Sequence, residues 1–190
     1  MNQPADSSEG VVILLTGLPA AGKTTLAKAL AAELENGADR AVTLLDGDEV
    51  RRLLSSELGY SREHRRLNVL RHAYVAAEIC RHGGVAVCAL IAPYAADRAE
   101  MRRMVSPHGR FVQIYVATPL EVCQQRDPKG LYAQARAGRL RHLTGIDDPY
   151  EPPQRPELAL DTSMLSVPEC VAQVIAHLQG SGTLTAGTAT

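Results

Sequence analysis

The stretch VVILLTGLPAAGKTT, residues 11–25, decides the fold of this 190-residue chain. Its first six residues form a nearly continuous apolar run, which predicts a strand buried on both faces. Residues 17–24 match the pattern G-x-x-x-x-G-K-[ST] in full, and strong helix formers follow from Thr24 to Glu35. This strand–loop–helix order is the context that a phosphate-binding P-loop requires, whereas a chance glycine turn would not fill every motif position. The stretch therefore predicts nucleotide binding.

The chemistry of this loop follows from its residue types. Glycine lets the backbone wrap closely around phosphate oxygens, and successive N–H groups with the positive end of the following helix attract anions. We expect Lys23 to act as a catalytic group on the β- and γ-phosphates of ATP, and the Thr24 hydroxyl to bind Mg²⁺. The predicted nucleotide-binding positions in the loop are Gly17, Leu18, Pro19, Ala20, Ala21, Gly22, Lys23, Thr24 and Thr25.

Short β-rich runs alternate with helical stretches along the rest of the chain. This alternation predicts an α/β, three-layer P-loop NTPase fold, in which helices flank a parallel five-stranded sheet and the chemistry lies at the carboxyl ends of the strands. The expected strands are Val11–Thr16, Ala41–Leu45, Val85–Ile91, Arg110–Val116 and Leu158–Leu160. The expected helices are Thr24–Glu35, Asp48–Glu57, Arg62–Arg81, Asp97–Met104, Leu120–Arg126, Leu131–Ala137 and Val167–Leu178.

The polar segments divide the chain. We expect a single P-loop kinase domain over residues 11–179, between a flexible N-terminus at residues 1–10 and a flexible, small-residue tail at 180–190. The stretch from about residue 127 to 156 is rich in Pro, Gly and Arg and too long for an ordinary connection, so it is interpreted as a lid segment.

Composition excludes several classes of partner. A formal net charge of −1 offers no global field for nucleic acid or an anionic membrane, so neither is expected to bind. The four cysteines are scattered without Cys-x-x-Cys pairs, and no metal-ligand spacing appears among Cys and His. The N-terminus lacks the basic region of a signal peptide, and no apolar run is long enough to span a bilayer. These features predict a cytoplasmic protein.

A P-loop alone does not distinguish a kinase from a GTPase. No Asn-Lys-x-Asp segment for guanine recognition occurs, and the single Asp-x-x-Gly match, Asp127–Gly130, follows a predicted helix instead of a strand. The chain size and the basic lid favour a small P-loop kinase whose lid excludes water.

The second strand ends in Asp46-Gly-Asp48-Glu-Val-Arg51, which places two carboxylates and an arginine where an acceptor would bind. Phosphoryl transfer needs a carboxylate to orient the attacking hydroxyl and take its proton, and Asp48 is the candidate base. Asp46 is a candidate magnesium ligand together with Thr24, and Arg51 can form a bidentate contact with an acceptor phosphate or sulfate. Asp48 could alternatively be a helix N-cap, and the two roles can coexist.

Several ordered blocks resemble adenylylsulfate kinases, which phosphorylate the ribose 3′-hydroxyl of adenylylsulfate. The resemblance runs from about Val11 to Thr162, and its most specific blocks are DGDEVR (46–51), LGYS (58–61), IAPY with DR (91–98), PLEVCQQRDPKGLY (119–132), ARAG (135–138) and LTGIDDPYEPP (143–153). It implies ATP and Mg²⁺ as cofactors, a homodimer, and phosphorylation of adenylylsulfate to 3′-phosphoadenylylsulfate.

The resemblance also assigns site residues. It implies that Lys129 is a catalytic cation in a mobile lid, that Arg126 packs on the ATP base or binds phosphate, and that Ile146 and Asp147 lie in a second lid segment. The implied acceptor-binding positions are Asp46, Asp48, Arg51, Tyr60, Arg65, Asn68, Ile91, Lys129, Gly130, Leu131 and Leu143. Without the resemblance, Arg65 could lie on a solvated helix face, and Lys129 or Arg126 could be a surface charge. Arg62 and Arg66 are interpreted as solvated.

Five positions depart from the family pattern. At one of them Tyr60 stands where a phenylalanine usually stacks on the acceptor adenine, and its ring can still stack. Ala92 replaces a serine that is phosphorylated in some relatives, so transfer is expected to be direct and in line. Leu143 stands where a phenylalanine usually stacks on the acceptor adenine, while Leu67 and Ala95 replace an acidic and a basic residue. These changes surround the acceptor and leave the ATP half intact. The alternatives are therefore a different nucleotide or nucleotide-like acceptor, or a non-catalytic nucleotide-binding protein.

Overall fold

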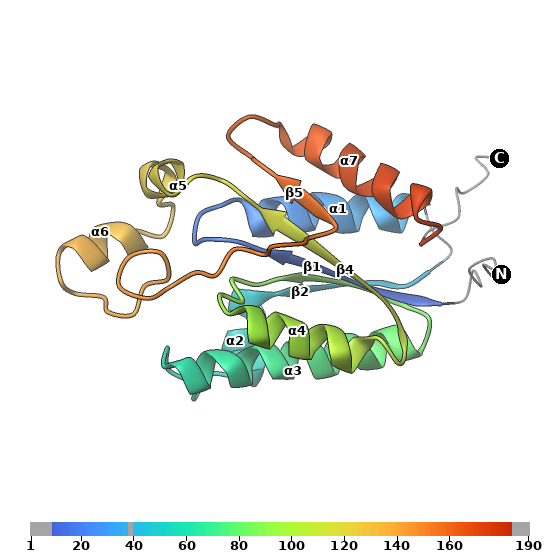
Figure 1. Cartoon of the computed structure of the whole chain (residues 1–190), viewed down its shortest axis with the longest axis horizontal. Helices are drawn as coiled ribbons and strands as arrows, with labels where there is room; N and C mark the ends of the chain where they lie inside the picture. Colours follow the sequence, from blue (N-terminus) through green and yellow to red (C-terminus); the bar gives the residue numbers. More distant parts are fainter. Residues whose placement is uncertain (1–8, 38–39, 184–190) are drawn as a thin grey trace.

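A parallel sheet forms the centre of the molecule. The computed structural model describes residues 9–37 and 40–183. Its strands are β1 Gly10–Thr16, β2 Val42–Asp46, β3 Val85–Ala89, β4 Gly109–Val116 and β5 Leu158–Leu160. They form a five-stranded sheet in the order β2-β3-β1-β4-β5, in which every neighbouring pair is parallel (Figure 1). The predicted α/β fold with a five-stranded parallel sheet is confirmed.

Helices cover both faces of this sheet. They are α1 Lys23–Gly37, α2 Gly47–Leu54, α3 Arg62–Arg81, α4 Ala95–Val105, α5 Leu120–Arg126, α6 Leu131–Arg136 and α7 Val167–Gly180. Figure 1 shows α1 and α7 on one face and α2, α3 and α4 on the other. In the described part of the chain, none of these helices combines the length and the apolar character needed to cross a membrane.

The central strand explains the first apolar run of the sequence. Val11, Ile13 and Leu15 pack into the core with α1 and α7, whereas Val12 and Leu14 pack under α3 and α4. All of β1 is buried. Because helices cover both faces, alternate residues of this strand enter two separate hydrophobic cores, so no polar position interrupts the run.

The predicted bounds of α3, α5 and β5 match the structure, while several others differ at one end. Helix α2 ends at Leu54 instead of Glu57, because Ser55 leaves helical geometry and accepts a turn hydrogen bond from Leu58 N at 3.0 Å. Strand β3 ends at Ala89 instead of Ile91, since Ala92 turns the chain with a φ of +41°.

The predicted flexible ends lie largely outside the described residues, namely at positions 1–8 and 184–190. Strand β1 starts at Gly10, and α7 continues to Gly180. Thr183, the last described residue, is buried and donates its N–H to Leu178 O at 2.8 Å. The structured part therefore extends slightly beyond residues 11–179.

The carboxyl ends of the strands share one edge of the sheet, at the left in Figure 1. Helices α5 and α6 and the loop of residues 137–157 project beyond that edge. This places the segment interpreted as a lid over the region where the P-loop and Asp46 emerge from β1 and β2.

Candidate active site

The P-loop, residues 17–24, connects β1 to α1 and folds around its own lysine. Lys23 is buried, and its Nζ donates to the backbone oxygens of Gly17 at 3.0 Å and Leu18 at 2.7 Å. Gly22 adopts a φ of +96°, a conformation that residues with a Cβ rarely adopt. The loop thus holds an ammonium group at the carboxyl end of the central strand.

Burial lowers the pKa of Lys23 to about 8. The neighbouring Cys123, Asp48 and Asp46 raise this pKa, and Lys129 lowers it. Lys23 and these four side chains therefore lie close enough to interact electrostatically, although they come from distant parts of the chain.

This depressed pKa predicts proton uptake when ATP binds. The triphosphate stabilises charged Lys23 and so raises its pKa in the complex. Above pH 8 the free protein holds Lys23 largely neutral, so binding must add a proton, and affinity should fall by up to about tenfold per pH unit.

Titration calorimetry in buffers of different ionisation enthalpy measures this uptake. We expect uptake approaching about one proton at about pH 9 and little from this group at about pH 7. Lys23→Arg, whose guanidinium remains protonated, should bind without it. If the wild type binds ATP at the higher pH without taking up a proton, the lowered pKa assigned to Lys23 is contradicted.

Asp46 joins the P-loop to the second strand. Its Oδ2 accepts a hydrogen bond from Thr24 Oγ1 at 2.8 Å, and its Oδ1 accepts from Asp48 N at 3.0 Å. Asp46 is therefore the N-cap of α2, with extended backbone angles. The suggestion that Asp48 is the cap was wrong by two residues: Asp48 lies in the first helical turn, and its carboxylate does not cap the helix.

The two proposed magnesium ligands, Thr24 and Asp46, lie together. Their oxygens are the hard donors that Mg²⁺ prefers, and Asp46 is buried. No group of three or more His, Cys, Asp or Glu that could hold a metal occurs among residues 9–37 and 40–183. This donor set fits an ion that keeps waters and phosphate oxygens among its ligands, as Mg²⁺ does, and does not fit an all-protein cage.

Asp48 points into solvent and contacts the segment interpreted as a lid. Its side chain is 69 % exposed and forms an ion pair with Lys129 Nζ, which comes from the turn between α5 and α6. The two residues that the sequence suggested for proton acceptance and charge neutralisation are thus in contact across 81 positions of the chain.

Arg51 and Arg65 both lie close to the ring of Tyr60. The guanidinium carbon of Arg51 is 4.4 Å from the centroid of the Tyr60 ring, and that of Arg65 is 5.6 Å away. Arg51 also donates to the backbone oxygens of Leu58 and Gly59. Tyr60 itself is 51 % exposed, so its ring remains available to stack on a planar ligand.

Asn68 follows Arg65 by three residues on α3, as the sequence suggested. Within the described residues, its buried Oδ1 atom has no hydrogen-bond partner. An orphaned buried acceptor is costly in a protein interior, and a bound donor would satisfy it.

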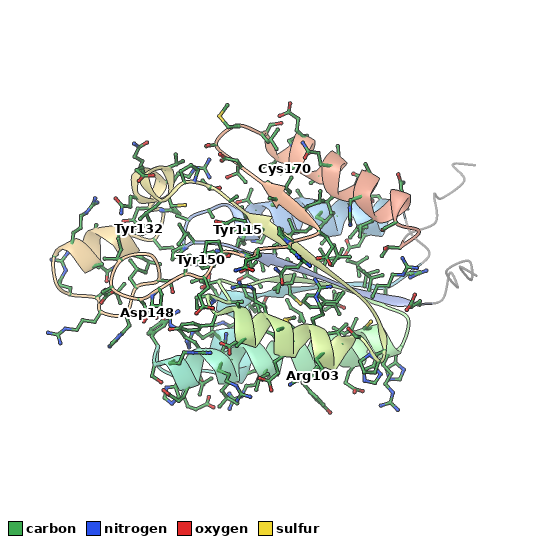
Figure 2. All side chains as sticks on the ribbon, viewed as in Figure 1. Arg103, Tyr115, Tyr132, Asp148, Tyr150 and Cys170 are labelled. Carbon is green, nitrogen blue, oxygen red and sulfur yellow. The ribbon has the colours of Figure 1, made fainter. Side chains whose placement is uncertain are left out.

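The segment interpreted as a lid is anchored on the P-loop by a residue that the sequence interpretation missed. Tyr132, at the start of α6, is buried, and its hydroxyl donates to Pro19 O at 3.0 Å (Figure 2). Asp127 accepts from the backbone N–H groups of Tyr132 at 3.1 Å and Ala133 at 2.9 Å. An aromatic residue with a polar tip inside a loop segment was the available signal.

Arg126 reaches the other side of the P-loop through Thr162. Its Nη1 and Nη2 atoms donate to Thr162 Oγ1 and O, both at 2.7 Å, and Thr162 Oγ1 donates to Ala21 O at 3.0 Å. Thr162 was also missed. It lies two residues after the end of β5, so the rule that polar residues at the carboxyl ends of strands line the site would have found it.

The site therefore brings together the phosphate-binding loop, the Asp48 carboxylate that interacts with Lys23, and two arginines beside the exposed ring of Tyr60. The family model that describes adenylylsulphate kinase matches residues 9–161. The chain belongs to the adenylylsulphate kinase family.

Individual relatives agree with this assignment. The adenylyl-sulfate kinase of Synechococcus sp. (strain JA-3-3Ab) is 48 % identical over 175 residues, which cover 92 % of this chain and 97 % of the relative. The structure of the Mycobacterium tuberculosis APS kinase CysC in complex with AMPPNP and APS matches with a TM-score of 0.86 and 37 % identity, covering 90 % of this chain and 98 % of that one. The hexameric APS kinase from Thiobacillus denitrificans is 43 % identical with a TM-score of 0.74, covering 94 % of this chain and 30 % of that one.

As an adenylylsulphate kinase family member, the chain is a kinase that binds nucleotides, which confirms the class of enzyme predicted from the sequence. The structure gives less direct support to three other acceptor positions that the resemblance implies, namely Ile91, Gly130 and Leu131. Ile91 is half-buried, and its carbonyl accepts from Thr16 Oγ1 at 2.6 Å. Gly130 is the N-cap of α6, and Leu131 begins that helix.

Leu143 lies in a different environment from the one expected for an adenine contact. It is 6 % exposed and belongs to the hydrophobic core on the side of α1 and α7. In this conformation the Leu143 side chain packs the loop of residues 142–148 onto the core and offers little surface to an acceptor. Asp147 accepts from His142 N and Leu143 N, both at 2.6 Å, so it also holds this loop.

Arg62 and Arg66, which were interpreted as solvated, have side chains that are 40 % and 48 % exposed and that also form ion pairs. Arg62 Nη1 lies 2.5 Å from Oδ2 of Asp97, whose side chain is 1 % exposed, and Arg66 Nη2 lies 2.7 Å from Glu100 Oε2. A buried carboxylate requires a partner, and α3 supplies it across the interface with α4. Sequence spacing could not show this long-range pairing.

Gly145 allows the loop of residues 142–148 to pack on the P-loop. It adopts a φ of +90°, and a Cβ at this position would lie 2.8 Å from Leu18 Cδ2. Gly145→Ala should lower the free energy of unfolding by about 2 kcal/mol, because left-handed strain adds to this contact.

Gly138→Ala is the matched control, because Gly138 has a φ of +69° and nothing within 4 Å of the added Cβ. Its free energy of unfolding should fall by only about 1 kcal/mol, which is the part that comes from left-handed strain. Urea unfolding measures both variants, and equal losses would show that contact with Leu18 contributes nothing.

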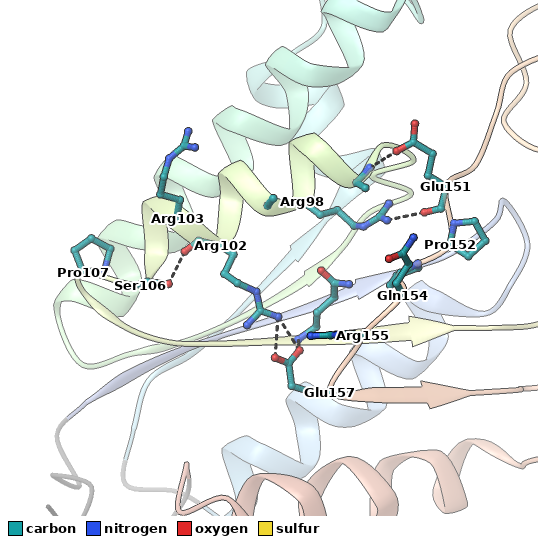
Figure 3. A pocket seen from close by; sticks show the side chains of 14 residues that line it. Arg98, Arg102, Arg103, Ser106, Pro107, Glu151, Pro152, Gln154, Arg155 and Glu157 are labelled. Atoms are coloured by element: carbon teal, nitrogen blue, oxygen red, sulfur yellow. Dashed lines mark hydrogen bonds and ion pairs between the residues drawn. The ribbon is translucent and has the colours of Figure 1, made fainter. Parts of the chain in front are cut away.

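A groove between α4 and residues 151–157 has no P-loop residue in its lining (Figure 3). Two of its arginines have partners: Arg102 makes two hydrogen bonds of 2.8 Å to Glu157, and Arg98 donates to Ala92 O and Glu151 O. This groove therefore fixes the segment 151–157 on α4.

Proposed function

We propose that this protein transfers the γ-phosphoryl group of ATP to the 3′-hydroxyl of adenylylsulfate, giving 3′-phosphoadenylylsulfate. The observation that carries the proposal is the placement of Asp48. Its exposed carboxylate contacts Lys129 and interacts electrostatically with Lys23, so it lies close to the place where the P-loop holds a terminal phosphate. A base in this position can receive the proton of an attacking hydroxyl.

On the donor side, the N–H groups of the P-loop and Lys23 bind the β- and γ-phosphates of ATP. Thr24 and Asp46 would hold Mg²⁺, which neutralises charge on the phosphate oxygens when it is bound. Arg126 lies beside the loop through Thr162 and faces the nucleotide from the opposite side. The P-loop residues from Gly17 to Thr25 complete this half of the site.

On the acceptor side, Tyr60 stacks on the base, and Arg51 and Arg65 bind the phosphate and sulfate groups. Asn68 donates or accepts a hydrogen bond with the sugar or base. Ile91, Gly130 and Leu131 enclose the acceptor as the lid closes, while Leu143 packs in the core under the loop of residues 142–148. Lys129 moves from Asp48 to the transferring phosphoryl group, where its charge stabilises the transition state and frees the base.

Transfer is direct and in line. Position 92 carries Ala92, which is 3 % exposed and has no hydroxyl, so no phosphoserine intermediate can form there. The nucleophile is therefore the acceptor hydroxyl itself.

A coupled assay of ADP release tests this function. Mg-ATP is offered with adenylylsulfate, with other nucleotides and with simple alcohols, and the product is identified by chromatography. We expect turnover with adenylylsulfate and formation of its 3′-phosphate. Turnover with another nucleotide alone would replace the acceptor in this proposal. Tight ATP binding without any turnover would favour a non-catalytic role.

We further propose a single kinase domain over residues 11–179, with residues from about 127 to 156 as its lid, that acts in the cytoplasm as a homodimer. The ion pair of Lys129 with Asp48 and the anchor of Tyr132 on the P-loop support the lid, because both join residues of this segment to the site. Light scattering of the purified chain measures the oligomeric state, and a monomer at micromolar concentration would contradict the dimer.

A further inference from the structure

Arg65 is a buried cation held by groups from two other segments. Its Nε lies 3.0 Å from both Tyr60 O and Asp148 Oδ2, and its Nη2 donates to His142 O. The side chain is 8 % exposed, and burial lowers its pKa. Within the described part of the chain, Nη1 has no hydrogen-bond partner. One edge of the guanidinium is therefore fixed by the protein, and one N–H₂ group remains to bind a ligand.

Asp148 is itself held firmly in place. Its N–H donates to Leu143 O at 3.2 Å, and its carbonyl accepts from Gly145 N at 2.8 Å, so the backbone of the loop 142–148 closes on it. Its Oδ2 accepts from Tyr94 Oη at 3.4 Å. Figure 2 shows Asp148 in the loop that lies between the lid helix α6 and the sheet.

The segment beyond Asp148 is attached to α4. Glu151 N donates to Pro93 O at 2.8 Å, and Glu151 Oε2 accepts from Ala95 N at 2.7 Å. Arg98, which is 2 % exposed, donates to Glu151 O (Figure 3). These bonds fix the carboxylate of Asp148 relative to α4, so it can determine the direction of Arg65.

Tyr94 is fixed in turn by α3. It is 7 % exposed, and the guanidinium of Arg62 lies 3.7 Å from its ring centroid. Arg62 is anchored by buried Asp97. A continuous set of contacts therefore runs from Asp97 through Arg62 and Tyr94 to Asp148 and Arg65.

We propose that Asp148 is a positioning residue that orients Arg65, so that the free edge of its guanidinium faces the phosphate–sulfate part of the acceptor. This inference rests on the proposed function, since it assigns the orienting group of the same acceptor site. A buried guanidinium without its counter-charge turns toward other acceptors, and a small displacement of a binding group weakens binding strongly.

Steady-state kinetics of Asp148→Asn test the proposal. We expect the KM for adenylylsulfate to rise by about tenfold to a hundredfold, with kcat within about threefold and the KM for ATP unchanged, because only acceptor binding loses an oriented partner. In an Arg65→Ala background the same change should add less than about twofold, since Asp148 acts through Arg65. Glu100→Gln is the matched control, because it removes a carboxylate that pairs with another arginine of α3, Arg66, without touching Arg65 or Asp148.

The outcomes separate this inference from the proposed function. A wild-type protein without adenylylsulfate turnover overturns the function. If the wild type is active and the acceptor KM of Asp148→Asn is unchanged, the inference alone is overturned. It is also overturned if Asp148→Asn raises the acceptor KM by the same factor in the wild-type and the Arg65→Ala backgrounds. If Asp148→Asn does not fold, Asp148→Glu decides: its longer stem should raise the acceptor KM with the KM for ATP unchanged, and an unaltered acceptor KM overturns the proposal.

Discussion

Asp48→Asn should lower kcat by about a thousandfold while ATP binding stays within about threefold, because an asparagine keeps the size of aspartate but cannot accept a proton. The side chain lies on the first turn of α2, exposed and outside the P-loop, so its replacement leaves the nucleotide contacts in place. ADP release measures the loss of turnover, and calorimetry with AMPPNP measures nucleotide binding.

Glu49→Gln provides the control for Asp48→Asn. Glu49 is the next residue on the same helical turn and is exposed, so its substitution removes the same charge without removing the base. We expect activity within about twofold of wild type, as for most surface changes. Near-normal turnover in Asp48→Asn would remove Asp48 as the base.

Lys23→Ala should abolish transfer, with a fall in kcat/KM for ATP of at least about a thousandfold. The ammonium group is the cation held within the P-loop, and losing it removes charge stabilisation from both the bound phosphates and the transition state. ATP binding should weaken together with turnover, which distinguishes this variant from Asp48→Asn.

Lys28→Ala is the matched control for Lys23→Ala, since it removes an exposed lysine from the same helix α1. It should retain activity and ATP binding. Thermal unfolding separates a loss of function from a loss of fold. Lys23→Ala should unfold close to the wild-type temperature, because burial of its charge already disfavours the ammonium form. An active Lys23→Ala protein would contradict the P-loop assignment.

Local patterns in the sequence predicted much of the fold. The continuous apolar run of β1 led correctly to a doubly covered central strand. The bounds of α3 were predicted correctly, and the structure shows that Ser61 caps its N-terminus, where its side chain accepts from His64 N. The N-cap of α2 was misplaced, because the same segment offers Asp46 and Asp48, and only the backbone angles of the folded chain distinguish them.

The candidate site was predicted where it follows the strand ends, and it was missed where it depends on contacts between distant segments. Thr24 lies at the end of the P-loop that follows β1, and Asp46 and Asp48 lie at the end of β2, so the topology of a parallel sheet brings them together. The contact of Arg65 with Asp148 joins residues 83 positions apart (148 less 65) in segments without regular spacing. The burial of Leu143 likewise depends on how the loop 142–148 packs, which no local pattern specifies.

The most direct test of the account is one distance in a ternary complex. A crystal structure with AMPPNP, Mg²⁺ and adenylylsulfate, with the lid closed, gives the separation between the Asp48 carboxylate and the 3′-hydroxyl of the acceptor. We predict a hydrogen bond of about 2.6–3.2 Å, with that hydroxyl facing the γ-phosphorus. A carboxylate more than about 5 Å from the hydroxyl, beyond hydrogen-bond reach and without a bridging water, would contradict the proposed chemistry.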